Sequence, residues 1–144
     1  MHAFPHHYNV SVQSGNEGDA ILSSAGLTDI ESQAPVEFGG PGNRWSPETL
    51  LTAAVADCFA LGFRAIANAS KVGYSQLNVN VVGVLDRVER KMQFTGMQIQ
   101  AELVVPEGVD HERAKKLLEK AEESCLITNS MNVEVSLKTN VATG

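Results

Sequence analysis

Two cysteines, Cys58 and Cys125, are the residues of this chain best suited to redox chemistry. A thiolate can attack the O–O bond of a peroxide and become a sulfenic acid, and a second thiol can then condense with it to give a disulfide. The attacking sulfur needs a lowered pKa, and so a nearby cation, and the second sulfur must lie within bridging reach. The spacing alone also allows a simpler interpretation, in which both thiols are small buried core residues.

The segment 46–67 must position Cys58, and its sequence predicts a helix that is apolar almost all round. Ser46 can cap this helix, and Pro47 suits its first position, where the missing N–H is not needed. Glu48 adds a negative charge to the first turn, where the helix dipole favours it. The segment looks too short and too interrupted by charge to cross a membrane, so we expect it to be buried in protein.

The remaining pattern predicts strands before and after this helix, and a second helix late in the chain. The expected strands are 8–12 and 20–24 as a hairpin, a short edge strand at 35–38, long strands at 77–90 and 92–105, and a last strand at 133–137; the second helix begins after Asp110 and ends near Cys125. This order indicates an α+β fold with a mainly antiparallel sheet. One small sheet cannot cover so apolar a helix, so we expect a dimer that buries it from the other side.

Length and charge limit the possible functions. The 144 residues favour a single domain over 1–144, and a net charge of −6 argues against nucleic acid as the main partner. The first residues show no basic region followed by an apolar run, so a cytoplasmic location is expected. In that reducing compartment a structural disulfide between the cysteines is unlikely, whereas a transient one is possible.

Other motifs give weaker signals. His2, His6 and His7 lack the cysteines or acids that would complete a tetrahedral metal site. The glycine-rich loop 39–45 precedes a helix but has no Walker lysine and no G-x-G-x-x-G pattern. We therefore expect no metal and no bound cofactor, and we expect the loop to bring backbone and side chains close to a pocket that Trp45 helps to line.

Two stretches resemble the OsmC/Ohr family. The first is Phe38-Gly39-Gly40-Pro41-Gly42 with Ser46-Pro47-Glu48-Thr49-Leu50-Leu51 and Ala53-Ala54-Val55-Ala56-Asp57-Cys58-Phe59; the second is Ala121-Glu122-Glu123-Ser124-Cys125-Leu126-Ile127-Thr128-Asn129-Ser130. The resemblance covers most of the chain. A proline–glutamate helix start ten residues before one cysteine, together with a cysteine after the second long helix, is a specific combination.

The resemblance implies an OsmC-like fold and a thiol-dependent peroxidase that favours organic hydroperoxides. It implies an intertwined homodimer in which the apolar central helix is buried and the active sites lie at the dimer interface. Cys58 would be the peroxidatic cysteine and Cys125 the resolving one, and an external dithiol would reopen their disulfide. Glu48 would match the family glutamate that orients an arginine beside the thiolate.

The chain departs from the family pattern at that arginine. In one branch the arginine precedes the Phe-then-Gly-Pro-Gly stretch, where this chain has Glu37, and residues 1–43 contain no arginine that could match the other branch. Arg44 is the nearest candidate, and we expect it to supply the cation. The alternatives are an OsmC-fold protein that binds a small apolar ligand without efficient turnover, and a redox sensor.

Overall fold

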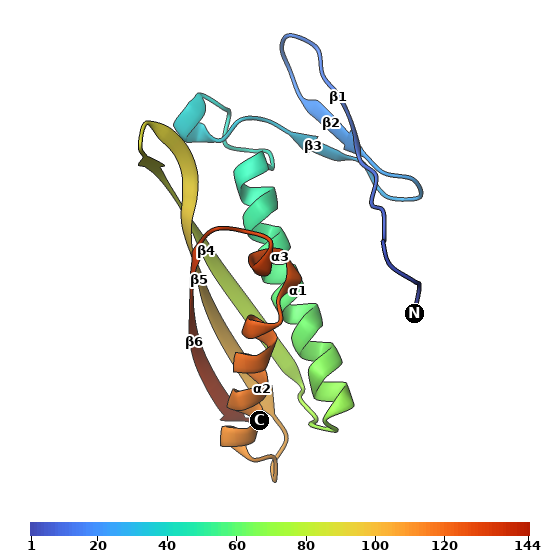
Figure 1. The fold of residues 1–144 in the computed structure, drawn as a ribbon, viewed down its shortest axis with the longest axis vertical. Helices are drawn as coiled ribbons and strands as arrows, with labels where there is room; N and C mark the ends of the chain where they lie inside the picture. The colour runs from blue at the N-terminus through green and yellow to red at the C-terminus, as the bar shows by residue number, and fades with distance from the viewer. The chain divides into compact units, whose positions relative to one another are not determined.

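The computed structural model describes all of residues 1–144, which divide into two compact units, Met1–Leu50 and Leu51–Gly144. The first unit holds a three-stranded antiparallel sheet of β1 (Ser11–Gln13), β2 (Ala20–Ser23) and β3 (Ile30–Ser32), in that order. A 3₁₀ turn, η1 (Val36–Phe38), follows the sheet (Figure 1). Helix α1 (Pro47–Ala69) begins in this unit and continues into the second.

The predicted hairpin is confirmed, but its first strand is shorter and begins three residues later than expected. The stretch 26–34, for which we predicted no strand, contains β3. The predicted edge strand at 35–38 is wrong. There the N–H of Phe38 donates to the carbonyl of Pro35 at 2.9 Å, and Gly39 then adopts a left-handed φ of 88°, which closes a turn instead.

The start of α1 is the capping arrangement that the sequence predicts. The N–H of Thr49 donates to the Ser46 hydroxyl at 3.1 Å, and the N–H of Ser46 donates to the Thr49 hydroxyl at 2.8 Å. Ser46 is 1% exposed, and Pro47 is the first helical residue. These reciprocal bonds satisfy N–H groups that a helix start leaves without partners.

The end of α1 is closed by a lysine rather than by the nearby Gly73. Lys71 takes the left-handed conformation, with a φ of 57°. The N–H of Val72 donates to the carbonyl of Ala67, and the N–H of Lys71 donates to that of Asn68. This is the Schellman pattern, which needs a left-handed residue directly after the helix and here uses a lysine.

The second unit is a three-stranded sheet with α1 and two further helices. Strands β4 (Gln76–Val88) and β5 (Lys91–Val105) form the predicted antiparallel hairpin, and β6 (Glu134–Thr143) pairs in parallel with β5. Glu89 and Arg90 both have positive φ, so they form a tight two-residue turn. The last strand is longer than the predicted 133–137.

Helix α2 (His111–Glu123) is capped by Asp110, whose carboxylate accepts from the N–H of Glu112 at 2.9 Å. A short helix, α3 (Leu126–Asn129), follows where the sequence predicted only a connection. The core forms between the inner face of the sheet and the helices. Its fully buried side chains include Val55, Phe59 and Phe63 of α1, Met97 and Leu103 of β5, and Leu118 of α2.

Helix α1 is long and apolar enough, by length and composition, to cross a membrane. The expectation that it is too short is therefore wrong, because the helix has 23 residues where a span needs about 20. A core helix of a soluble protein passes the same test. Only 22% of the residues in its most apolar stretch are fully buried within the chain, and Leu61 in this stretch is 47% exposed.

Candidate functional site

The fold brings Cys58 and Cys125 together within the second unit. Cys58 lies on α1 and is half-buried, whereas Cys125 lies two residues beyond α2 and is only 3% exposed. Their side chains are close enough for each thiol to shift the pKa of the other, and both are free thiols. The sequence indicated each cysteine as a candidate site residue but not that the two meet. The fold brings their side chains close together.

Burial raises the pKa of the Cys58 thiol, and the neighbouring Cys125 sulfur raises it further. The backbone N–H groups of Ile127 and Leu126 act in the opposite direction. A thiol in such surroundings keeps its proton more firmly than a free cysteine does, because a thiolate loses solvation when it is buried.

The pKa of the Cys125 thiol is lowered, although burial by itself would raise it. The hydroxyl and N–H of Thr128, the Cys58 thiol and the N–H of Ile127 all favour the charged form and together outweigh burial. The two thiols are therefore unequal in the resting state, and Cys125 is the more acidic sulfur.

Helix α3 supplies several of these groups. Leu126, Ile127 and Thr128 form its first turn, where N–H groups have no partner within a helix. The N–H groups of Thr128 and Ile127 lie near the Cys125 sulfur and lower the pKa of its thiol. Sequence analysis missed this contribution. The sequence feature that could have indicated this contribution is the short run Leu126–Asn129 directly after Cys125, with a threonine three positions beyond the cysteine.

Arg44 and Glu48, the other two predicted site residues, lie in the first unit. The Arg44 guanidinium pairs through Nε with Asp19 at 3.2 Å and through Nη2 with Glu31 at 3.0 Å. Glu48 lies half-buried in the first turn of α1. The structure thus brings the two cysteines close together as free thiols. The roles of Arg44 as the cation beside Cys58 and of Glu48 in orienting it stay a prediction.

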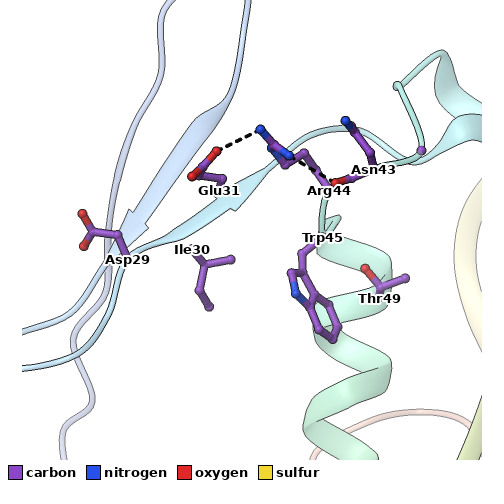
Figure 2. Close-up of a pocket in the computed structure, with 8 residues that line it drawn as sticks. Asp29, Ile30, Glu31, Asn43, Arg44, Trp45 and Thr49 are labelled. Carbon is purple, nitrogen blue, oxygen red and sulfur yellow. Dashed lines mark hydrogen bonds and ion pairs between the residues drawn. The ribbon is translucent and has the colours of Figure 1, made fainter.

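A hollow of about 570 Å³ lies beside Arg44 in the first unit. Figure 2 shows the indole of Trp45 and the side chain of Ile30 at this hollow, with the Glu31–Arg44 ion pair at one edge. Trp45 is 52% exposed and lines a pocket, as the sequence suggested. Phe59, which follows Cys58 on α1, is fully buried in the core of the second unit.

Comparisons with known proteins agree on one family. Residues 40–140 match the model of the OsmC-like protein family. A structure from Legionella pneumophila, described as an organic hydroperoxide resistance protein OsmC, superposes with a TM-score of 0.77 at 26% identity, covering 97% of this chain and 99% of that one. An OsmC-like protein of unknown function from Vibrio cholerae, VCA0330, gives a TM-score of 0.87 at 19% identity, covering 94% and 100% of the two chains.

A curated relative, the uncharacterized protein YmaD of Bacillus subtilis (strain 168), is 25% identical over 145 residues, which are 96% of this chain and 97% of that protein. The family match spans both cysteines and most of the fold, and the solved structures share its α+β architecture. The low identities mark a divergent member. The chain therefore belongs to the OsmC family.

Proposed function

We propose that this protein is a thiol-dependent peroxidase that reduces organic hydroperoxides through Cys58 and Cys125. The observation that carries the proposal is the proximity of the two thiols, one on α1 and one in the short connection between α2 and α3. The Legionella relative is described as an organic hydroperoxide resistance protein, and this agrees with the same chemistry.

In the proposed reaction the Cys58 sulfur attacks the outer peroxide oxygen, the O–O bond breaks and an alcohol leaves after taking up a proton. Cys58 is then a sulfenic acid. The Cys125 thiolate attacks the Cys58 sulfur, water leaves, and a disulfide joins the two cysteines. An external dithiol reopens this disulfide by exchange and is itself oxidised, so no bound cofactor is needed.

Cys58 is the attacking residue in this proposal because it is half-buried and Cys125 is almost fully enclosed. Its raised pKa means that another group must favour its thiolate during the attack. We assign that cation role to Arg44, with Glu48 orienting it. Arg44 must then exchange at least one of its present partners, Asp19 or Glu31, for the site.

The proposal includes a homodimer in the cytoplasm, where dithiol reductants are available. Leu61 of α1 is 47% exposed, and only 22% of the residues in the apolar stretch of this helix are fully buried within its own chain. A second copy of the chain would bury the exposed part of this surface. Neither nucleic acid nor membrane is a partner in this proposal.

The first test is the intact mass and free-thiol count of the reduced protein before and after one equivalent of cumene hydroperoxide. We expect the wild type to lose two thiols and two mass units. Cys125→Ser should stop at a sulfenic acid on Cys58, and Cys58→Ser should keep its remaining thiol. Survival of both wild-type thiols would exclude the peroxidase. A faster reaction with hydrogen peroxide than with cumene hydroperoxide would contradict the organic substrate.

The raised pKa of Cys58 and the carboxylates around Arg44 favour a second candidate, a small-molecule-binding or redox-sensing protein without efficient turnover. The hollow beside Trp45 offers such a ligand an apolar wall. A reagent selective for thiolates distinguishes the two candidates. A peroxidase requires Cys58 to react at neutral pH much faster than a free cysteine, and a binding protein does not.

A further inference from the structure

Thr128 is a buried polar residue that the mechanism above does not use. It is 5% exposed and lies in α3, three residues beyond Cys125. Its hydroxyl donates to the carbonyl of Cys125 at 3.2 Å, and the same hydroxyl is among the groups that lower the pKa of the Cys125 thiol. A threonine hydroxyl carries one proton that rotates about the Cβ–Oγ1 bond, so it can serve either acceptor.

The surroundings of the two sulfurs are unequal. The Thr128 hydroxyl favours the thiolate of Cys125. The groups that favour the thiolate of Cys58 are the backbone N–H groups of Ile127 and Leu126. In thiol–disulfide exchange the sulfur that leaves most readily is the one whose thiolate is best stabilised.

We propose that Thr128 is a positioning residue that fixes Cys125 as the leaving sulfur, so that the reductant attacks the disulfide at Cys58. This proposal rests on the two-cysteine reaction described above. The thiolate of the reductant bonds to the Cys58 sulfur, the Cys58–Cys125 bond breaks, and the electron pair departs on Cys125. The Thr128 hydroxyl then turns from the carbonyl to the new thiolate. A second thiol of the reductant releases Cys58 and closes a disulfide in the reductant.

Access favours the same direction of attack. The Cys58 side chain is half-buried, whereas Cys125 is 3% exposed and has Thr128 next to it. A thiol that approaches in line with the disulfide bond reaches Cys58 with less displacement of protein. Burial and leaving-group stability therefore select the same sulfur.

The direct test maps the site of attack on the wild-type protein. The disulfide is formed with diamide, so that no peroxide activity is required, and is then opened with limiting glutathione and quenched with iodoacetamide. Trypsin separates Cys58 in peptide 45–64 from Cys125 in peptide 121–138. We expect glutathione on Cys58 and the alkyl group on Cys125. Glutathione mainly on Cys125 would overturn the proposal.

Variants then assign the effect to the hydroxyl. Thr128→Val should move the lower thiol titration, followed by absorbance at 240 nm, upward by about one pH unit, and should slow disulfide opening by dithiothreitol about three- to tenfold. Thr128→Ser should restore both. Thr95→Val is the matched control, since Thr95 also donates to a backbone carbonyl, that of Val84, but lies away from the thiols.

These results separate the two proposals. If Thr128→Val behaves like the wild type in titration and in opening, or if serine fails to restore them, Thr128 has no positioning role. An unreactive wild type toward hydroperoxide with a normal Thr128 effect would instead reject the peroxidase and keep the role of Thr128 in disulfide exchange.

Discussion

At the scale of single residues, the chemistry depends on the unequal acidity of two neighbouring thiols. Burial and the Cys125 sulfur raise the pKa of Cys58, whereas Thr128, Cys58 and nearby N–H groups outweigh burial and lower the pKa of Cys125. The more accessible sulfur is thus the less acidic one. Once Cys58 is oxidised, the lower pKa of Cys125 favours the resolving step, because Cys125 forms the attacking thiolate more readily.

This division predicts a two-step titration of the reduced protein. One thiolate should form below the ordinary cysteine range and the other above it. Cys125→Ser should remove the lower step, because the acidic sulfur is lost, and Cys58→Ser should remove the upper step. Absorbance at 240 nm against pH measures both. Two thiols that titrate together, or a lower step that survives Cys125→Ser, would contradict the assignment.

The cation role of Arg44 is tested by Arg44→Ala. If Arg44 stabilises the charge that develops on the peroxide oxygen, its loss should slow the reaction with cumene hydroperoxide at least about tenfold. Stopped-flow kinetics with the exposed Arg87→Ala as control measures the effect. An unchanged rate and an unchanged pKa of Cys58 would reject the role.

At the scale of elements, the approach of α1 to the sheet depends on a glycine of β4. A Cβ built on Gly83 would lie 2.6 Å from the Thr52 hydroxyl and 3.0 Å from the Phe94 ring. A one-residue irregularity follows directly, between Val84 and Leu85, where β4 passes Thr95 of β5. Gly83 therefore allows the helix that carries Cys58 to pack closely on the strand.

Gly83→Ala should destabilise the fold by about 1–3 kcal/mol, the range typical of overpacking. Gly96→Ala on β5 is a matched control, because its Cβ would meet only the carbonyl of Glu134 at 3.5 Å, an ordinary contact. Urea unfolding of both variants measures the difference. Equal free energies of unfolding would show that α1 does not press on β4 at this position.

Elements with strong local signals could be predicted from the sequence. Alternating valines gave the β4–β5 hairpin, and Ser46 and Asp110 gave both helix starts. Elements that depend on other segments could not. Strand β3 is polar and exists because it pairs with β2, and α3 is one turn with no periodicity to read. The contact between the cysteines, set by how α1 and α2 pack, was likewise beyond local reasoning.

At the scale of the whole molecule, the first unit raises a question of stability. Its buried residues are Ser32 and Ser46, and none of them is apolar. Its strands have three or four residues, and large side chains such as Tyr8, Val12 and Phe38 are exposed. A sheet this small needs an apolar face packed against something to be stable. A second copy of the chain would supply the missing surface to both this unit and α1.

This reasoning predicts an obligate dimer that a charge on α1 disrupts. Leu61 is 47% exposed on α1, so Leu61→Glu should place a carboxylate in the proposed interface and shift the protein toward monomer by at least about 2 kcal/mol, roughly a thirtyfold weaker association. Val82 is similarly exposed, at 50%, on β4, away from that helix face, so Val82→Glu is the matched control. Sedimentation equilibrium across a dilution series measures both variants.

The unfolding midpoint gives a second readout, because dimer burial helps to stabilise this chain and the midpoint should fall when the protein is diluted. For Leu61→Glu this fall should begin at a higher protein concentration than for the wild type. A wild type that sediments as a monomer at every concentration would refute the dimer, and a Leu61→Glu dimer as tight as that of Val82→Glu would place its interface elsewhere.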